Sequence, residues 1–112
     1  MQDNRPLKVS IFMLAYNHEE FVEEAILSVI NQKVNFNYLL IIGEDFSSDN
    51  TREVCKKYHN LHPDKIKLIL HSQNIGPAAN AKIVYKACSD SLSQYVAVLE
   101  SDDYWNDIYK LQ

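Results

Sequence analysis

Apolar runs of strand length alternate along this chain with segments whose apolar residues recur at helical spacing. The run at residues 9–15 is almost continuously apolar, which predicts a buried central strand. Similar runs predict three further strands at residues 38–42, 66–70 and 95–99. Strands that alternate with helices are typical of βαβ units, so the pattern predicts an α/β fold.

The segments between the strands predict three helices. The first has an apolar stripe made of Phe21, Val22, Ala25, Ile26, Val29 and Ile30. Asn17 and Glu20 stand before it at the spacing of an N-terminal cap and its reciprocal partner. The second helix, at residues 50–59, carries the helically spaced apolar residues Val54, Cys55 and Tyr58.

The third helix is predicted to begin at Pro77, because proline costs no hydrogen bond in a first turn. Its buried face is predicted to consist of Ala79, Ile83, Val84 and Ala87. Together the elements predict a Rossmann-like, mostly parallel sheet with helices on both faces.

The 112 residues fit one domain, residues 1–112. The last residues follow a helical pattern that stops at Gln112, so we expect a trimmed N-terminal part of a longer protein. Apolar sheet surface exposed in such a piece would favour a homodimer.

The net charge and the two cysteines limit the kinds of partner and the cellular compartment that we expect for this chain. The net charge of −4 argues against a nucleic-acid partner, since phosphate backbones are bound by clustered Lys and Arg. Cys55 and Cys88 lie in separate helical patterns without metal-ligand spacing, which predicts buried free thiols and a reducing, cytoplasmic location. No apolar stretch approaches the roughly 20 residues that span a bilayer, so membrane association would have to come from regions elsewhere.

Polar and aromatic residues follow each predicted strand. They are Tyr16–Asn17, Gly43–Glu44–Asp45, residues 71–76 and residues 100–105. Ligands of open parallel sheets bind beyond the carboxyl ends of the strands, so this edge is where a site is expected.

The acidic segment Glu100-Ser101-Asp102-Asp103 places three carboxylates within four positions at the end of a buried strand. Such carboxylates repel one another, and a cation offsets the charge. Mg²⁺ or Mn²⁺ fits best, because hard ions take carboxylate and phosphate oxygens. The segment therefore predicts a metal site that clamps a diphosphate.

Each of these signals also has an ordinary structural interpretation. The acidic segment could cap a short helix at residues 104–110, and Asp45 could only shape a turn. Tyr16 could be an aromatic residue at the edge of the core, and Asn17 only a cap. Their coincidence on one sheet edge is what favours a functional interpretation.

The residues at the strand ends resemble the family 2 glycosyltransferases. The resemblance rests on Val-Ser-Ile-Phe-Met-Leu-Ala-Tyr-Asn at 9–17, Gly-Glu-Asp-Phe-Ser-Ser-Asp-Asn-Thr at 43–51, Asn74-Ile75-Gly76, and Glu-Ser-Asp-Asp at 100–103, in the family's order. It implies a GT-A fold whose first half binds a nucleoside-diphosphate sugar, and this chain corresponds to that half. The trailing residues resemble bacterial members that build surface polysaccharides.

The resemblance also implies roles for individual residues. Tyr16 would stack on the nucleobase, and Asp45 would accept a hydrogen bond from a base N–H, favouring uracil. Asp102 would approach the ribose and Asp103 would ligate Mg²⁺ or Mn²⁺, with the two roles exchangeable. The remaining residues implied in nucleotide binding are Ala15, Asn17, Asn74 and Gly76.

The implied reaction transfers a sugar, UDP-linked in the simplest case, to a glycan or lipid-linked acceptor. The cation would neutralise charge on the leaving diphosphate. The family's catalytic base belongs to the later half, so no catalytic residue is assigned.

A different α/β module remains an alternative. A receiver domain would have an acidic pair after its first strand, where this chain has Ala15-Tyr16-Asn17. A nucleotidyltransferase would have a glycine-rich phosphate loop, whereas the chain contains only Gly43 and Gly76. Neither alternative matches the residues at the strand ends.

Overall fold

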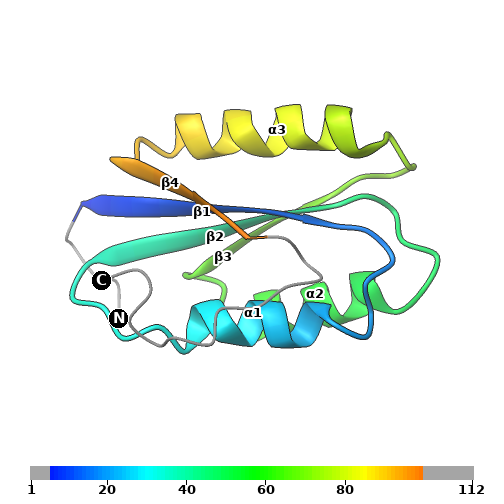
Figure 1. Ribbon diagram of the computed structural model, residues 1–112, viewed down its shortest axis with the longest axis horizontal. Helices are drawn as coiled ribbons and strands as arrows, with labels where there is room; N and C mark the ends of the chain where they lie inside the picture. The colour runs from blue at the N-terminus through cyan, green and yellow to red at the C-terminus, as the bar shows by residue number, and fades with distance from the viewer. Residues whose placement is uncertain (1–5, 100–112) are drawn as a thin grey trace.

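The computed structural model describes residues 6–99, and these form one four-stranded sheet with three helices. The strands are β1 (Leu7–Ala15), β2 (Asn37–Glu44), β3 (Ile66–Leu70) and β4 (Tyr95–Val98). The helices are α1 (Val22–Ile30), α2 (Thr51–Leu61) and α3 (Pro77–Asp90). All strand pairs are parallel, in the order β3-β2-β1-β4 (Figure 1).

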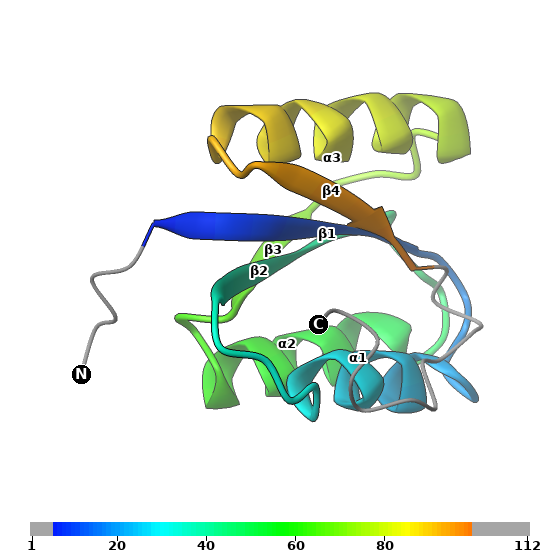
Figure 2. The same cartoon turned by 60° about the vertical axis from the view of Figure 1, so that its left-hand side comes forward.

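The helices cover both faces of the sheet. Helices α1 and α2 lie side by side on one face, and α3 lies on the other (Figure 2). We call these the α1/α2 face and the α3 face. This arrangement confirms the predicted Rossmann-like α/β fold. The helices lie on the faces because each connection between parallel strands has to cross over a face of the sheet.

The core on the α1/α2 face is apolar and extensive. Alternate residues of β1 and β2 point into it, including Ile11, Met13, Leu40 and Ile42. The apolar stripe of α1 and the residues Cys55 and Tyr58 of α2 close it from the other side. Within the predicted stripe of α1, Phe21 differs, because it precedes the helix and is exposed.

The predicted start of α1 is wrong. Phe21, not Asn17, occupies the N-cap position, and no side chain caps the helix. Residues 18–21 form a turn in which the His18 carbonyl accepts bonds from the Phe21 and Val22 N–H groups. Asn17 instead has a left-handed backbone (φ 53°) and bonds a different loop, so its side chain is not available to the helix.

The predicted buried face of α3 is partly wrong. Val84 is fully buried, but Ala79 and Ile83 are exposed, and the buried side chains beside Val84 are Asn80 and Cys88. The reason is Gly43 on β2, since a Cβ there would overlap Asn80 Oδ1 and Val84 Cγ2. Because Gly43 has no side chain, there is room for the polar side chain of Asn80 against the sheet.

Two smaller expectations are confirmed. Pro77 is in the first turn of α3. Cys55 and Cys88 are buried free thiols. Burial, with the negative charge of Glu44 adding to it, raises the pKa of the Cys55 thiol to about 12. Among residues 6–99, no helix is long and apolar enough to cross a membrane.

Candidate functional site at the carboxyl edge of the sheet

Strands β1, β2 and β3 end at the same level of the sheet. Ala15 pairs with Glu44, and Glu44 pairs with Leu70. The Asp45 N–H then donates to the Ala15 carbonyl at 3.0 Å, which sets Asp45 beside the exit of β1. The register therefore brings the ends of the first three strands into one neighbourhood, as expected for a parallel sheet.

Tyr16 follows β1 directly and is 44% exposed. A ring that is half in solvent at a strand end is available for stacking on a flat ligand. Ala15, by contrast, is fully buried in the core of the α1/α2 face, so only its backbone reaches the edge.

Asp45 holds the loop between β3 and α3. Its Oδ1 accepts from the Ile75 N–H at 2.8 Å, and its Oδ2 accepts from the Gly76 N–H at 3.0 Å and the Asn74 side-chain amide at 3.1 Å. The same amide donates to the Asp45 carbonyl at 3.1 Å. The carboxylate is 2% exposed, so Asp45 joins the predicted residues Asn74 and Gly76 into one unit.

Asn17 joins the loop after β1 to the loop after β2. Its side-chain oxygen accepts from the Ser48 N–H at 2.9 Å, and its own N–H donates to the Ser47 hydroxyl at 3.0 Å. Asn17 and Phe46 both have left-handed backbones, with φ of 53° and 58°. Such conformations are uncommon for a residue other than glycine. Here the bonds to Ser47 and Ser48 hold Asn17 in place, and a bond from its N–H to Glu44 holds Phe46.

Glu44 is a buried carboxylate to which the sequence pattern assigned no role. It is the last residue of β2 and is fully buried. It accepts from the Phe46 N–H at 3.1 Å, from the Ser47 N–H at 2.9 Å and from Arg52 Nη1 at 3.0 Å. The signal in the sequence for this ion pair was an acidic residue after an apolar run, together with an arginine in the first turn of the next helix.

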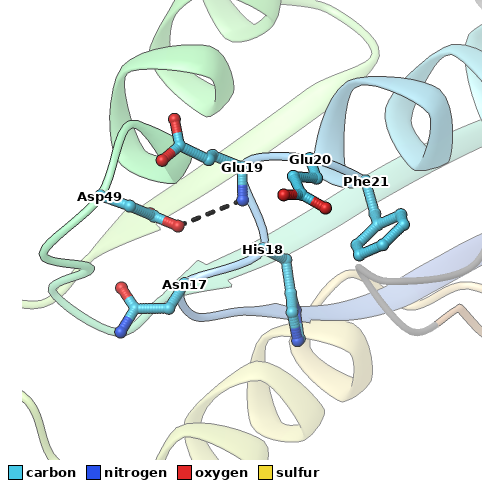
Figure 3. Close-up of a pocket in the computed structure, with 6 residues that line it drawn as sticks. All are labelled: Asn17, His18, Glu19, Glu20, Phe21 and Asp49. Atoms are coloured by element: carbon cyan, nitrogen blue, oxygen red, sulfur yellow. Dashed lines mark hydrogen bonds between the residues drawn. The ribbon is translucent and has the colours of Figure 1, made fainter.

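A polar hollow of about 230 Å³ lies beside these loops (Figure 3). It is lined by Asn17, His18, Glu19, Glu20, Phe21 and Asp49. Asp49 Oδ2 accepts from the Glu19 N–H at 3.2 Å, and its Oδ1 accepts from the Thr51 N–H at 2.9 Å. Partial desolvation opposes ionisation of Asp49, but these bonds and one from the Thr51 side chain outweigh it and lower the pKa.

Of the predicted site residues, the structure gathers Ala15, Tyr16, Asn17, Asp45, Asn74 and Gly76 at one edge. Asp102 and Asp103, like Glu100, lie outside the described residues. Strand β4 pairs with β1 in parallel, so its carboxyl end faces the same edge. Within residues 6–99, no group of three His, Cys, Asp or Glu side chains could hold a metal ion.

The sequence matches a known family over most of its length. The family model described as Glycosyl transferase family 2 matches residues 10–112. The minor teichoic acid biosynthesis protein GgaA of Bacillus subtilis is 35% identical over 84% of this chain and 21% of GgaA. The chain spans less than two fifths of the length of the first curated relatives that it matches.

Solved structures share the fold. S. aureus TarS in complex with UDP has a TM-score of 0.76 and 26% identity, covering 93% of this chain and 30% of that chain. The mannosyltransferase PcManGT of Pyrobaculum calidifontis, in complex with GDP-Man and Mn²⁺, has a TM-score of 0.73 and 19% identity over 93% of this chain and 30% of that chain. The second similarity shows the fold alone.

Proposed function

The chain belongs to glycosyl transferase family 2, and from this premise we propose that it binds the donor of a sugar transfer reaction. The donor in this proposal is a nucleoside-diphosphate sugar, UDP-linked, and the acceptor is a growing glycan or a lipid-linked glycan. The whole protein would act in the synthesis of a surface polysaccharide. The single observation that carries the proposal is the exposed ring of Tyr16 beside the loop unit organised by Asp45.

The nucleobase is proposed to stack on Tyr16. The ring follows β1 directly and has nearly half of its surface free. The Asp45 N–H bonds the carbonyl of Ala15, the residue before Tyr16, and the Asp45 carboxylate already accepts three hydrogen bonds, while a carboxylate offers about four acceptor positions. We propose that its remaining position accepts the base N–H, and that the Asn74–Gly76 backbone borders the ribose.

The choice of UDP is supported by TarS, which has been crystallised with UDP and with UDP-GlcNAc. TarS and this chain share 26% identity over most of the chain. GgaA acts in teichoic acid biosynthesis, which supports a cell-surface polymer as the product class. The buried free thiols agree with a reaction in a reducing, cytoplasmic compartment.

A divalent metal is proposed at Asp102 and Asp103. Their carboxylate oxygens suit Mg²⁺ or Mn²⁺, and they follow β4, which runs parallel to β1 and whose last residue, Val98, pairs with Phe12. PcManGT, which shares the fold, binds Mn²⁺ together with GDP-Man. When bound, such an ion would supply charge neutralisation on the diphosphate leaving group. The described residues would hold the base and the ribose, and none of them is assigned as the catalytic base.

Titration of the chain with UDP and GDP, in Mn²⁺ and in EDTA, tests the proposal. We expect UDP with Mn²⁺ to raise the melting temperature, with about 2.7 kcal/mol of stabilisation at a hundredfold excess over Kd. Asp103→Ala should abolish the dependence on Mn²⁺. Equal stabilisation by UDP in EDTA would contradict the metal-bridged site.

The Tyr16→Ala variant tests stacking separately. Base stacking is worth about 1–3 kcal/mol per base, so we expect the UDP Kd to rise at least roughly fivefold. Tyr85→Ala is the matched control, because Tyr85 is a 63% exposed tyrosine on α3 outside the edge. Wild-type affinity in Tyr16→Ala would exclude the stacking role.

A further inference from the structure

The end of β2 carries two neighbouring carboxylates that act on opposite faces of the sheet. Glu44 lies on the α1/α2 face, near Cys55 and Arg52 of α2. Asp45 bonds the segment that leads into α3. Side chains of a strand alternate between faces, so two consecutive acids hold two different sets of loops.

Arg52 connects Glu44 to the beginning of the loop between β3 and α3. Its Nη1 donates to Glu44 Oε2 at 3.0 Å and to the His71 carbonyl at 2.9 Å. The guanidinium also lies over the ring of Phe46, 5.5 Å from its centroid. A fully buried carboxylate needs such a partner, because removal of one member leaves an uncompensated buried charge.

The loop of residues 71–76 is therefore held at both ends from the same strand end. Arg52 holds the carbonyl of His71, and Asp45 holds the N–H groups of Ile75 and Gly76. The His71 ring is fixed as well: Asn80 Nδ2 donates to the Gly43 carbonyl at 2.9 Å, which leaves Asn80 Oδ1 to accept from His71 Nε2 at 2.8 Å.

We propose that Glu44 and Arg52 are positioning residues for the nucleotide, an inference that rests on the function proposed above. The hydrogen bonds of the pair go to Phe46, Ser47 and His71, which are not among the residues proposed to touch the donor. The pair fixes His71 at one end of the loop and Phe46–Ser47 after β2. The first of these loops bonds Asp45, and the second bonds Asn17, the residue after Tyr16. Loss of the pair should therefore weaken donor binding by misplacing the Asn74–Gly76 backbone.

The UDP affinity of Arg52 variants, measured well below the melting temperature, tests this role. Arg52→Met leaves the Glu44 carboxylate without its cation and the His71 carbonyl without its donor, so it should raise the Kd for UDP roughly tenfold or more. Arg52→Lys keeps a cation with three donors and should recover part of the affinity. Glu44→Gln combined with Arg52→Met should cost less than the two single changes added together.

Two controls separate positioning from a general loss of stability. Lys86→Met removes the cation of an exposed ion pair with Asp90 on α3, and it should leave the Kd unchanged. Val29→Ala destabilises the core far from the edge, and it should lower the melting temperature without changing the Kd. In the ligand-free chain, Arg52→Met should speed hydrogen exchange at the Ile75 and Gly76 amides.

The outcomes distinguish this role from the proposed function. If the wild-type chain binds UDP and Arg52→Met binds it within twofold, the positioning role is wrong. The same conclusion follows if Val29→Ala weakens binding as much as Arg52→Met does, or if the Ile75 and Gly76 amides exchange at wild-type rates in Arg52→Met. A wild-type chain that binds no UDP contradicts the proposed function instead.

Discussion

Ile41 and Ile42 are neighbours on β2 and both are fully buried, yet they belong to cores of different size. Ile42 lies in the cluster on the α1/α2 face, which draws buried residues from both helices and from β1, β2 and β3. Ile41 lies on the α3 face, where the buried apolar residues of the cluster are Ile41, Val84 and Cys88. Partly buried residues such as Phe12 and Leu14 surround this smaller group.

The smaller core is supplemented by polar contacts. Asn80 is 1% exposed and bonds both the Gly43 carbonyl and the His71 ring. Asp45 bonds the N–H groups just before α3. Apolar packing is non-directional, whereas hydrogen bonds fix orientation. The α1/α2 face therefore holds the larger apolar core, whereas polar contacts of Asp45 and Asn80, together with the bond from Arg52 to His71, fix the loop that borders the proposed donor site.

The largest expected effect comes from truncating these two isoleucines. Ile→Ala in a core costs about 2–5 kcal/mol, and we expect Ile42→Ala near the upper end and Ile41→Ala near the lower end. The reason is that the larger cluster loses more contacts around the cavity. Urea unfolding of the two variants measures the difference, and equal losses would remove the contrast between the faces.

Gly43→Ala should have the next largest effect. The new Cβ overlaps Asn80 Oδ1 and Val84 Cγ2, so α3 has to shift, and overpacking of this kind costs about 1–3 kcal/mol. Asn80→Ala in the same chain should relieve part of the clash, which makes the two changes non-additive. If Gly43→Ala unfolds at the same urea concentration as the wild-type chain, the inference that α3 packs closely against β2 is wrong.

The smallest expected effect is a difference between the labelling rates of the two cysteine thiols. Cys55 lies on the α1/α2 face and Cys88 on the α3 face, and both are buried free thiols. Burial also raises the pKa of Cys88, although a hydrogen bond with Ser10 opposes the shift. Both thiols therefore react with alkylating agents only after an opening.

We expect the Cys88 thiol to become accessible when α3 opens locally, whereas the Cys55 thiol becomes accessible only on global unfolding. Cys88 should therefore be labelled roughly tenfold faster. Cys55→Ala and Cys88→Ala chains allow each thiol to be followed alone at fixed pH. Labelling of both at the global unfolding rate would show that α3 is as firmly attached as the other helices.

The order and nature of the elements could be predicted from local sequence patterns. The apolar run of β1, the stripe of α1 and Pro77 at the start of α3 each depend on neighbours within a few positions, which periodicity reports directly. The family motifs likewise identified Tyr16, Asp45, Asn74 and Gly76 as candidates, and the parallel register places them at one edge.

The partners of the polar side chains, by contrast, are set by the folded arrangement of the chain. Asn17 bonds Ser48 instead of capping α1, Glu44 becomes a buried acceptor for Arg52, and Asn80 replaces Ala79 and Ile83 on the buried face of α3. Each outcome depends on residues that are distant in the sequence, such as Gly43 for Asn80 or His71 for Arg52. A local pattern records how polar a position is, but the partner of a buried polar group is fixed only when the strands come into register.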